Sequence, residues 1–184
     1  MGTFHTASAT ILLDRWPMKG QTKIEFEAFR RATAKKLRAY MRCACNRPED
    51  ADDLVQDCYL RALRAWGQFN GSGSRQAWLF AIARNAYVDW LRQKKRTGST
   101  VSIENVDPPA ARHEHPTHDA ENVWKIIEGL PPEQRDTINL RFAAQLSYAE
   151  IAQTLGLPIG TVRSRLHRAL KAVRQQTRGR EDDA

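Results

Sequence analysis

Residues 146–169 read LSYAEIAQTLGLPIGTVRSRLHRA, and this stretch decides the fold of the C-terminal half of the chain. Ser147 and Glu150 stand three residues apart just before an apolar run, which is the capping-box pattern of a helix N-terminus. Gly156 is placed to end that helix, and Pro158 is placed to begin the next one. Two short helices joined by a glycine-containing turn predict a helix-turn-helix.

The second helix of this pair is expected to have one apolar and one basic face. At 100° per residue, the apolar side chains from Val162 to Val173 fall on one side. Residues 158–180 contain seven bases and no acid. Arginine can pair with guanine in the major groove, so we expect this helix to read duplex DNA rather than to present only a solvated basic face. The expected contacts are Arg163, Ser164, Arg165, His167, Arg168 and Lys171, supported by Arg141, Tyr148 and Thr161.

The rest of the chain also has a helical pattern. Apolar residues recur at steps of three and four over residues 26–44, 51–65, 79–90 and 120–130. No alternating strand pattern of useful length is present, so we expect an all-α chain made of two small helical bundles joined by a flexible linker. The expected boundaries are a mobile extension over 1–21, a domain over 22–97, the linker over 98–118, a domain over 119–178 and an acidic tail over 179–184.

The net charge of +8 on 184 residues is unevenly distributed. Residues 1–47, 58–97 and 158–180 each carry +7, whereas residues 48–57 carry −5. Basic blocks favour a polyanion such as nucleic acid, although solvated helix faces explain them equally well on charge alone. No apolar run approaches the roughly 20 residues that a membrane helix needs. Three cysteines and the lack of a secretory pattern favour the cytoplasm.

The stretch quoted first resembles region 4 of bacterial RNA polymerase sigma factors, most of all the extracytoplasmic-function (ECF) group of the sigma-70 family. Region 4 reads the −35 promoter element. LuxR-type regulators contain a related helix-turn-helix, so this motif alone leaves a stand-alone regulator as the alternative.

The N-terminal half contains two further motifs. EDADDLVQD at residues 49–57 resembles sigma region 2.2, which docks on the clamp helices of the largest polymerase subunit. An acidic helix start stabilised by its dipole explains the same residues. AWLFAIARNAYVDWLR at residues 77–92 resembles regions 2.3 and 2.4, which open and read the −10 element. Aromatic, amide and basic groups on one helix face suit single-stranded DNA.

The resemblance implies which residues bind each partner. Core polymerase contacts are expected from Asp50, Asp53, Gln56 and Asp57. Contacts with −10 DNA are expected from Asn70, Trp78, Asn85, Asp89, Arg92 and Arg96, and the loop from Phe69 to Ser74 is expected to hold a flipped-out base. For Trp78, a place in the hydrophobic core is an alternative of equal weight to DNA binding.

Together the motifs imply a sigma factor that binds promoter DNA and the clamp helices and flap of core polymerase, and is held inactive by an anti-sigma protein. A polymerase adaptor that binds no DNA would use the acidic helix alone. No constellation of catalytic groups is present, so we expect neither an enzyme nor a cofactor. His113, His115 and His118, with Cys43 and Cys45, offer a metal site that a flexible linker disfavours.

Overall fold

A computed structural model of the chain describes residues 20–45, 47–96 and 118–181. The described residues form helices and turns without a strand, so the all-α prediction is confirmed. The elements are α2 (Gly20–Ala44), α3 (Pro48–Arg64), the 3-10 helix η1 (Trp66–Gln68), α4 (Arg75–Arg96), α5 (His118–Glu128), α6 (Pro132–Phe142), α7 (Tyr148–Leu155) and α8 (Ile159–Glu181).

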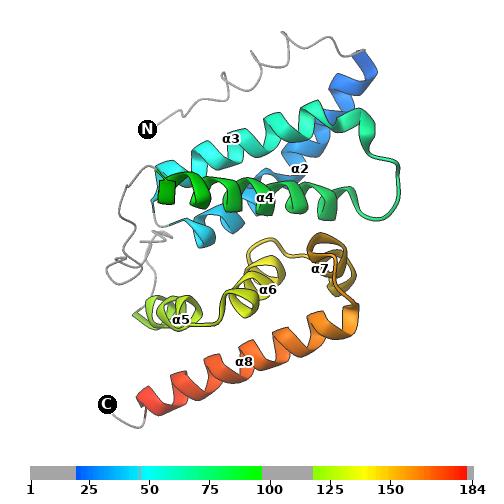
Figure 1. The fold of residues 1–184 in the computed structure, drawn as a ribbon. Helices are drawn as coiled ribbons and strands as arrows, with labels where there is room; N and C mark the ends of the chain where they lie inside the picture. The colour runs from blue at the N-terminus through cyan, green and yellow to red at the C-terminus, as the bar shows by residue number, and fades with distance from the viewer. Residues whose placement is uncertain (1–19, 46, 97–117, 182–184) are drawn as a thin grey trace.

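Helices α2, α3, η1 and α4 form the N-terminal unit (Figure 1). Pro48 in the first turn of α3 already has the helical φ, and the acids Glu49 and Asp50 favour the positive end of the helix dipole. The core of the unit is aromatic at one end, where the rings of Phe26 and Trp66 meet edge to face with centroids 5.0 Å apart. This end lies beside the loop that enters α4, so the core fixes the position of that loop.

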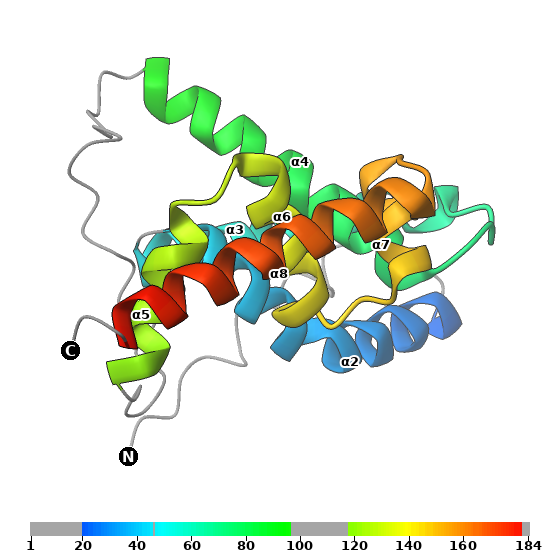
Figure 2. The same ribbon diagram turned by 90° about the horizontal axis from the view of Figure 1, so that it is seen from below.

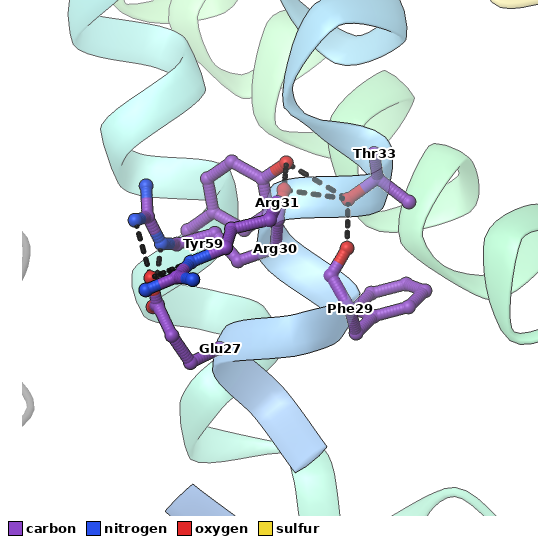
Figure 3. Close-up of polar contacts among 6 residues, drawn as sticks. All are labelled: Glu27, Phe29, Arg30, Arg31, Thr33 and Tyr59. Carbon is purple, nitrogen blue, oxygen red and sulfur yellow. Dashed lines mark hydrogen bonds and ion pairs between the residues drawn. The ribbon is translucent and has the colours of Figure 1, made fainter. Parts of the chain in front are cut away.

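A polar contact fastens α2 to α3 (Figure 3). The hydroxyls of Thr33 and Tyr59 lie 2.9 Å apart, and Thr33 also donates to the carbonyl oxygen of Phe29. One turn earlier, Glu27 accepts hydrogen bonds from Arg30 and Arg31 within α2. The pKa of Glu27 is lowered because the hydrogen bond from Arg30 outweighs the effect of burial. Burial raises the pKa of Tyr59 to about 12, so its hydroxyl stays protonated at neutral pH.

Helices α5 to α8 form the C-terminal unit, in which α8 runs beneath the other three (Figures 1 and 2). The predicted capping box is confirmed. Ser147 accepts from the backbone N–H of Glu150, whose carboxylate accepts in return from the N–H of Ser147 at 2.9 Å. Gly156 ends α7 with φ of 64°, in the left-handed region that favours glycine. The predicted helix-turn-helix is therefore the pair α7–α8.

The two units pack directly against each other. A single buried apolar cluster contains Leu37 and Phe80 of the N-terminal unit together with Leu140, Leu146 and Ile151 of the C-terminal unit. The sequence pattern predicted two separate bundles and gave no indication of this shared core. The predicted linker, apart from His118 at the start of α5, lies outside the described residues, and so do most of the predicted mobile extension and the last residues of the acidic tail. None of the described helices has both the length and the hydropathy needed to cross a membrane.

Candidate nucleic-acid interface

The first half of α8 presents its basic side chains to solvent. Leu166 and Ala169 are buried against the rest of the C-terminal unit, and Val162 is buried in the cluster that both units share, which turns the opposite face of the helix outward. The exposed predicted residues are Arg163, Ser164, His167, Arg168 and Lys171. Figure 1 shows α8 on the side of the C-terminal unit that faces away from α2, α3 and α4. This face is therefore open to a large partner such as a DNA duplex.

Two arginines of the predicted −35 set have different surroundings. The guanidinium of Arg165 is half-buried and pairs with Glu133 of α6 at 2.7 Å, so it fixes α8 to α6. Arg168 is exposed, and its guanidinium donates to the carbonyl oxygen and the hydroxyl of Ser164 at 3.3 Å. The contact between Arg168 and Ser164 lies within one exposed helix, so it is easily exchanged for a contact with DNA.

Two of the three supporting residues, Arg141 and Tyr148, lie beside the turn between α6 and α7. Arg141 donates to the carbonyl oxygen of Leu146 at 2.9 Å, and its guanidinium lies over the ring of Tyr148, 5.5 Å from the centroid. Tyr148 is 39% exposed, so its ring is open to solvent on one side. Thr161 lies in the first turn of α8 and accepts from the hydroxyl of Ser164 through its carbonyl oxygen. Through these two contacts, Arg141 stabilises the turn between α6 and α7.

An aromatic cluster lies between η1 and the start of α4. The half-buried ring of Trp78 has its centroid 5.7 Å from Phe69 and 6.2 Å from Trp66. Trp78 packs against the core, as one interpretation of the sequence expected, while remaining partly accessible. The guanidinium of Arg75 covers this cluster, 4.5 Å from the ring centroid of Trp66 and 5.1 Å from that of Phe69. Arg75 was not among the residues predicted to bind −10 DNA, although it is a basic residue between the aromatic residues Phe69 and Trp78 in the sequence.

The loop that precedes α4 is held in a defined shape. Asn70 accepts hydrogen bonds from the backbone N–H and the hydroxyl of Ser72, which closes a tight turn. Gly73 has φ of 79° and lies against the side chain of Gln153 in α7. Gln153 in turn accepts from the backbone N–H of Ser74 at 2.9 Å. The loop predicted to hold a base is therefore in contact with the helix-turn-helix.

The outer face of α4 carries the remaining predicted −10 residues. Asn85, Asp89, Arg92 and Arg96 are exposed and follow one another at helical steps of three and four. Arg61 of α3 donates to the carboxylate of Asp89 at 3.0 Å, and Arg92 lies 3.7 Å from the same carboxylate. The charge of Asp89 is thus compensated, so this face stays attractive to a polyanion. Periodicity could not identify Arg61, because the bond joins residues 28 positions apart.

Of the four residues predicted to dock core polymerase, two face solvent and two are paired. Asp53 and Gln56 are exposed on α3. Asp50 pairs with Lys94 at 2.8 Å, and Asp57 pairs with Arg61 at 2.8 Å. Both pairs tie α3 to α4, directly or through Asp89. Asp53 and Gln56 are therefore the more available contacts for a partner.

The suggested metal site receives no support from the cysteines. Burial raises the pKa of the thiols of Cys43 and Cys45 to about 12, so both thiols are protonated at neutral pH in this structure. No group of three or more metal-binding side chains is found within the described ranges. His113 and His115 lie outside the described residues, as does the side chain of His118.

Comparison with known proteins identifies the family. Residues 26–97 match sigma-70 region 2, and residues 120–173 match sigma-70, region 4. The chain belongs to the sigma-70 family. The region 2 match resolves the choice left open by the helix-turn-helix, because a stand-alone LuxR-type regulator is not expected to contain that region.

Curated relatives place this sigma factor in the ECF group. It is 36% identical over 126 residues to the ECF RNA polymerase sigma factor SigC of Mycobacterium tuberculosis, covering 67% of this chain and 68% of the relative. It is 35% identical over 139 residues to the ECF RNA polymerase sigma-E factor of Escherichia coli, covering 67% of this chain and 72% of that one. SigE of Mycolicibacterium smegmatis is 34% identical over 131 residues, or 68% of this chain, and the match spans about half, 51%, of SigE.

Solved structures share the fold. The sigma factor RpoE from Bartonella quintana, in complex with the anti-sigma factor NepR, superposes with a TM-score of 0.72 at 25% identity, covering 84% of this chain and 97% of RpoE. CnrH, in complex with the cytosolic domain of CnrY, superposes with a TM-score of 0.65 at 23% identity, covering 92% of this chain and 96% of CnrH.

Proposed function

We propose that this sigma factor binds core RNA polymerase through α3 and directs initiation by reading a −35 duplex with α8 and melted −10 DNA with α4 and its preceding loop. The observation that carries the proposal is the ordered pair of region matches, over 26–97 and 120–173, combined with an exposed basic face on the second helix of the helix-turn-helix. The chain acts by binding, in the cytoplasm, and performs no reaction of its own.

The −35 contacts are proposed for the exposed face of α8. Arg163, Arg168 and Lys171 extend from one side of a helix whose other side is buried. A helix docked in the major groove places its first turns against base edges, where arginine reads guanine through two hydrogen bonds. We assign base contacts to Arg163 and Arg168, and a phosphate contact to Lys171. Arg165 supports the helix through Glu133 instead of reading a base.

The −10 contacts are proposed for the aromatic cluster and the outer face of α4. A flipped base needs an aromatic surface for stacking, and Phe69 and Trp78 are the partly accessible rings beside the loop. Arg92 and Arg96 supply positive charge for the backbone of the same strand. Asn85 offers an amide that can donate to or accept from a base edge.

The polymerase contact is proposed for the exposed part of α3. Asp53 and Gln56 present a carboxylate and an amide on one helix face, and both suit a basic protein surface. Asp50 and Asp57 lie on the same helix, but their pairs with Lys94 and Arg61 make them secondary contacts. An anti-sigma protein is the second proposed protein partner, because the sigma factor RpoE, which has a similar fold, was solved with the anti-sigma factor NepR bound.

Run-off transcription tests this proposal. Purified core polymerase is incubated with this protein and a library of genomic fragments, and transcripts are mapped by their 5′ ends. We expect transcripts that start at shared promoter motifs and require the protein. Absence of such transcripts, together with binding of duplex DNA as a dimer, would support a stand-alone regulator instead.

A further inference from the structure

The guanidinium of Arg75 lies over the aromatic cluster beside the loop that precedes α4. Its central carbon is 4.5 Å from the ring centroid of Trp66 and 5.1 Å from that of Phe69. Elsewhere in the N-terminal unit, Arg61 and Arg84 pair with carboxylates at 2.8 and 2.7 Å. Within the described part of the chain, no carboxylate pairs with Arg75. The positive charge of this exposed side chain is therefore available to a partner.

The stability of α4 does not explain a cation at this position. Arg75 is the first residue of α4, and the first turn of this helix contains no acid. The positive end of a helix dipole favours acidic side chains and disfavours basic ones. Ser74 caps the same turn by accepting from the backbone N–H of Ala77. Arg75 therefore adds positive charge to a helix end that is already positive, and both charges attract an anion.

The rings beneath Arg75 are fixed by the core, but one of them keeps an accessible part. Trp66 is 6% exposed and packs edge to face on Phe26. Phe69 is partly exposed, and its ring centroid lies 5.7 Å from that of Trp78. Because Arg75 is exposed, its guanidinium lies on the solvent side of Phe69. A base that stacks on this ring therefore competes with the guanidinium for the same aromatic surface.

A stacked base has the stronger claim to that surface. An exposed contact between a cation and a ring is weak, whereas stacking of a base on an aromatic side chain contributes more. The turn closed by Asn70 brings Arg75 back over Phe69, so a displaced guanidinium stays beside the bound nucleotide. The phosphate of that nucleotide is an anion that arginine binds through two parallel hydrogen bonds. Phosphate can therefore replace the ring as the partner of Arg75.

We propose that Arg75 is a further residue for −10 binding: when a base stacks on Phe69, the guanidinium of Arg75 moves from the aromatic cluster to the phosphate of that nucleotide. This assignment rests on the proposed function of the loop. A contact with phosphate carries no sequence information, so Arg75 strengthens the binding of every −10 sequence to the same extent. A contact with a base edge would instead favour one base.

The test uses the full chain bound to core polymerase, with a promoter fragment found by run-off mapping that carries a preformed bubble over the −10 element. R75Q should weaken binding of this bubble several-fold, and R75K should restore most of the affinity because lysine also binds phosphate. R42Q is the matched control. Arg42 is also exposed, pairs with no carboxylate of the described residues and lies in the last turn of α2. R42Q should bind as the unsubstituted protein does, and circular dichroism should show equal helix content for all four proteins.

Uncharged methylphosphonate linkages identify the phosphate. Single linkages of the −10 strand in the bubble are replaced in turn, and the affinity of each fragment is measured by fluorescence anisotropy. At one linkage the replacement should weaken binding by the unsubstituted protein and by R42Q several-fold. It should hardly affect R75Q, because the partner of that phosphate is already absent. A role of Arg75 in the fold alone would not produce this difference.

Three results would overturn the assignment while leaving the proposed function of the loop intact. The first is normal affinity of R75Q for the −10 bubble, and the second is equal sensitivity of R75Q and the unsubstituted protein at every linkage. The third is a changed base preference in R75Q, together with R75K binding as weakly as R75Q, which would indicate a contact with a base edge. Failure of the proposed function gives a different result. The unsubstituted protein with core polymerase would then bind the −10 bubble no more tightly than a bubble of scrambled sequence, and the assignment would fall with it.

Discussion

Ser74 donates its hydroxyl to Glu150 at 2.7 Å, so the residue that caps α4 binds the glutamate that completes the capping box of α7. The two residues are 76 positions apart and belong to the matches with different sigma regions. The carboxylate lies at the positive ends of two helix dipoles, an arrangement that favours its ionised form. This single carboxylate therefore links local helix stability to the contact between the units.

The Glu150 carboxylate predicts a pH dependence of stability. Burial alone would raise the pKa of Glu150, but hydrogen bonds from Ser74 and Ser147 outweigh burial and lower it below its ordinary value. A carboxylate with a lowered pKa in the folded state contributes stability above its unfolded pKa, and loses it as pH falls through the folded pKa. E150Q should therefore lower the free energy of unfolding at neutral pH, with a deficit that shrinks in acid.

Urea denaturation at a series of pH values measures this deficit. E49Q is the control, because Glu49 is exposed and lies 3.7 Å from its partner Arg47. E49Q should lower the free energy of unfolding only slightly, and by a similar amount at every pH. A deficit for E150Q that does not change between neutral and acid pH would exclude the ionised carboxylate as its source.

Replacing Gly156 should reduce stability through backbone strain alone. Its φ is 64°, and a Cβ added there would meet nothing within 4 Å. G156A should therefore destabilise the protein by about 1 kcal/mol, because alanine is strained in the left-handed region. Gly160 has equally open space in the first turn of α8 without a left-handed φ. G160A should instead stabilise the protein by about 0.4–1 kcal/mol. Thermal and urea denaturation measure both, and equal effects of the two substitutions would contradict this explanation.

Replacing Arg168 should change the sequence preference for −35 DNA. R168A should cost about 1–3 kcal/mol at one base pair and relax specificity there, since the arginine is assigned to a base edge. R174A, two turns further along the exposed side of α8, should weaken binding evenly across sequences or leave it unchanged. Affinities for a set of duplexes with single base-pair changes distinguish these results. An unchanged preference in R168A would remove this residue from the readout.

Reversing the charge of Asp53 should specifically weaken binding to core polymerase. D53K should weaken the affinity for core polymerase roughly tenfold or more, because it places like charges opposite each other at the proposed interface. D52K reverses the charge at the neighbouring position, which points elsewhere on α3 and lies 3.4 Å from Arg38 of α2. It should retain most of the affinity. Titration of labelled protein with core polymerase compares the two, and equal losses would favour general repulsion over a defined docking face.

The sequence predicted what depends on neighbouring residues. Ser147, Glu150 and Gly156 indicated the start and end of α7 because caps are determined within one helical turn. The apolar face of α8 followed from periodicity in the same way. The pairing of Asp136 with Tyr40, in contrast, joins residues 96 positions apart. Periodicity indicates which face of a helix is buried, but it does not indicate which other helix covers that face.

The candidate site shows the same division between local and distant contacts. The exposed positions on α4 and α8 were predictable, because polar faces follow from helix geometry. That Arg61 holds both Asp57 and Asp89 was not predictable, because it depends on how α3 and α4 pack. The direct contact between the two units escaped prediction for the same reason, since it depends on tertiary packing.

Permanganate reactivity of promoter thymines, measured alongside DNase I protection, tests the central claim most directly. The claim is that this chain makes core polymerase recognise a −35 duplex and open the −10 element. On a promoter found by run-off mapping, the protein with core polymerase should protect the −35 region and make −10 thymines reactive. Neither component alone should open the DNA. Protection of the −35 region with fully unreactive −10 thymines in the presence of core polymerase would contradict the account.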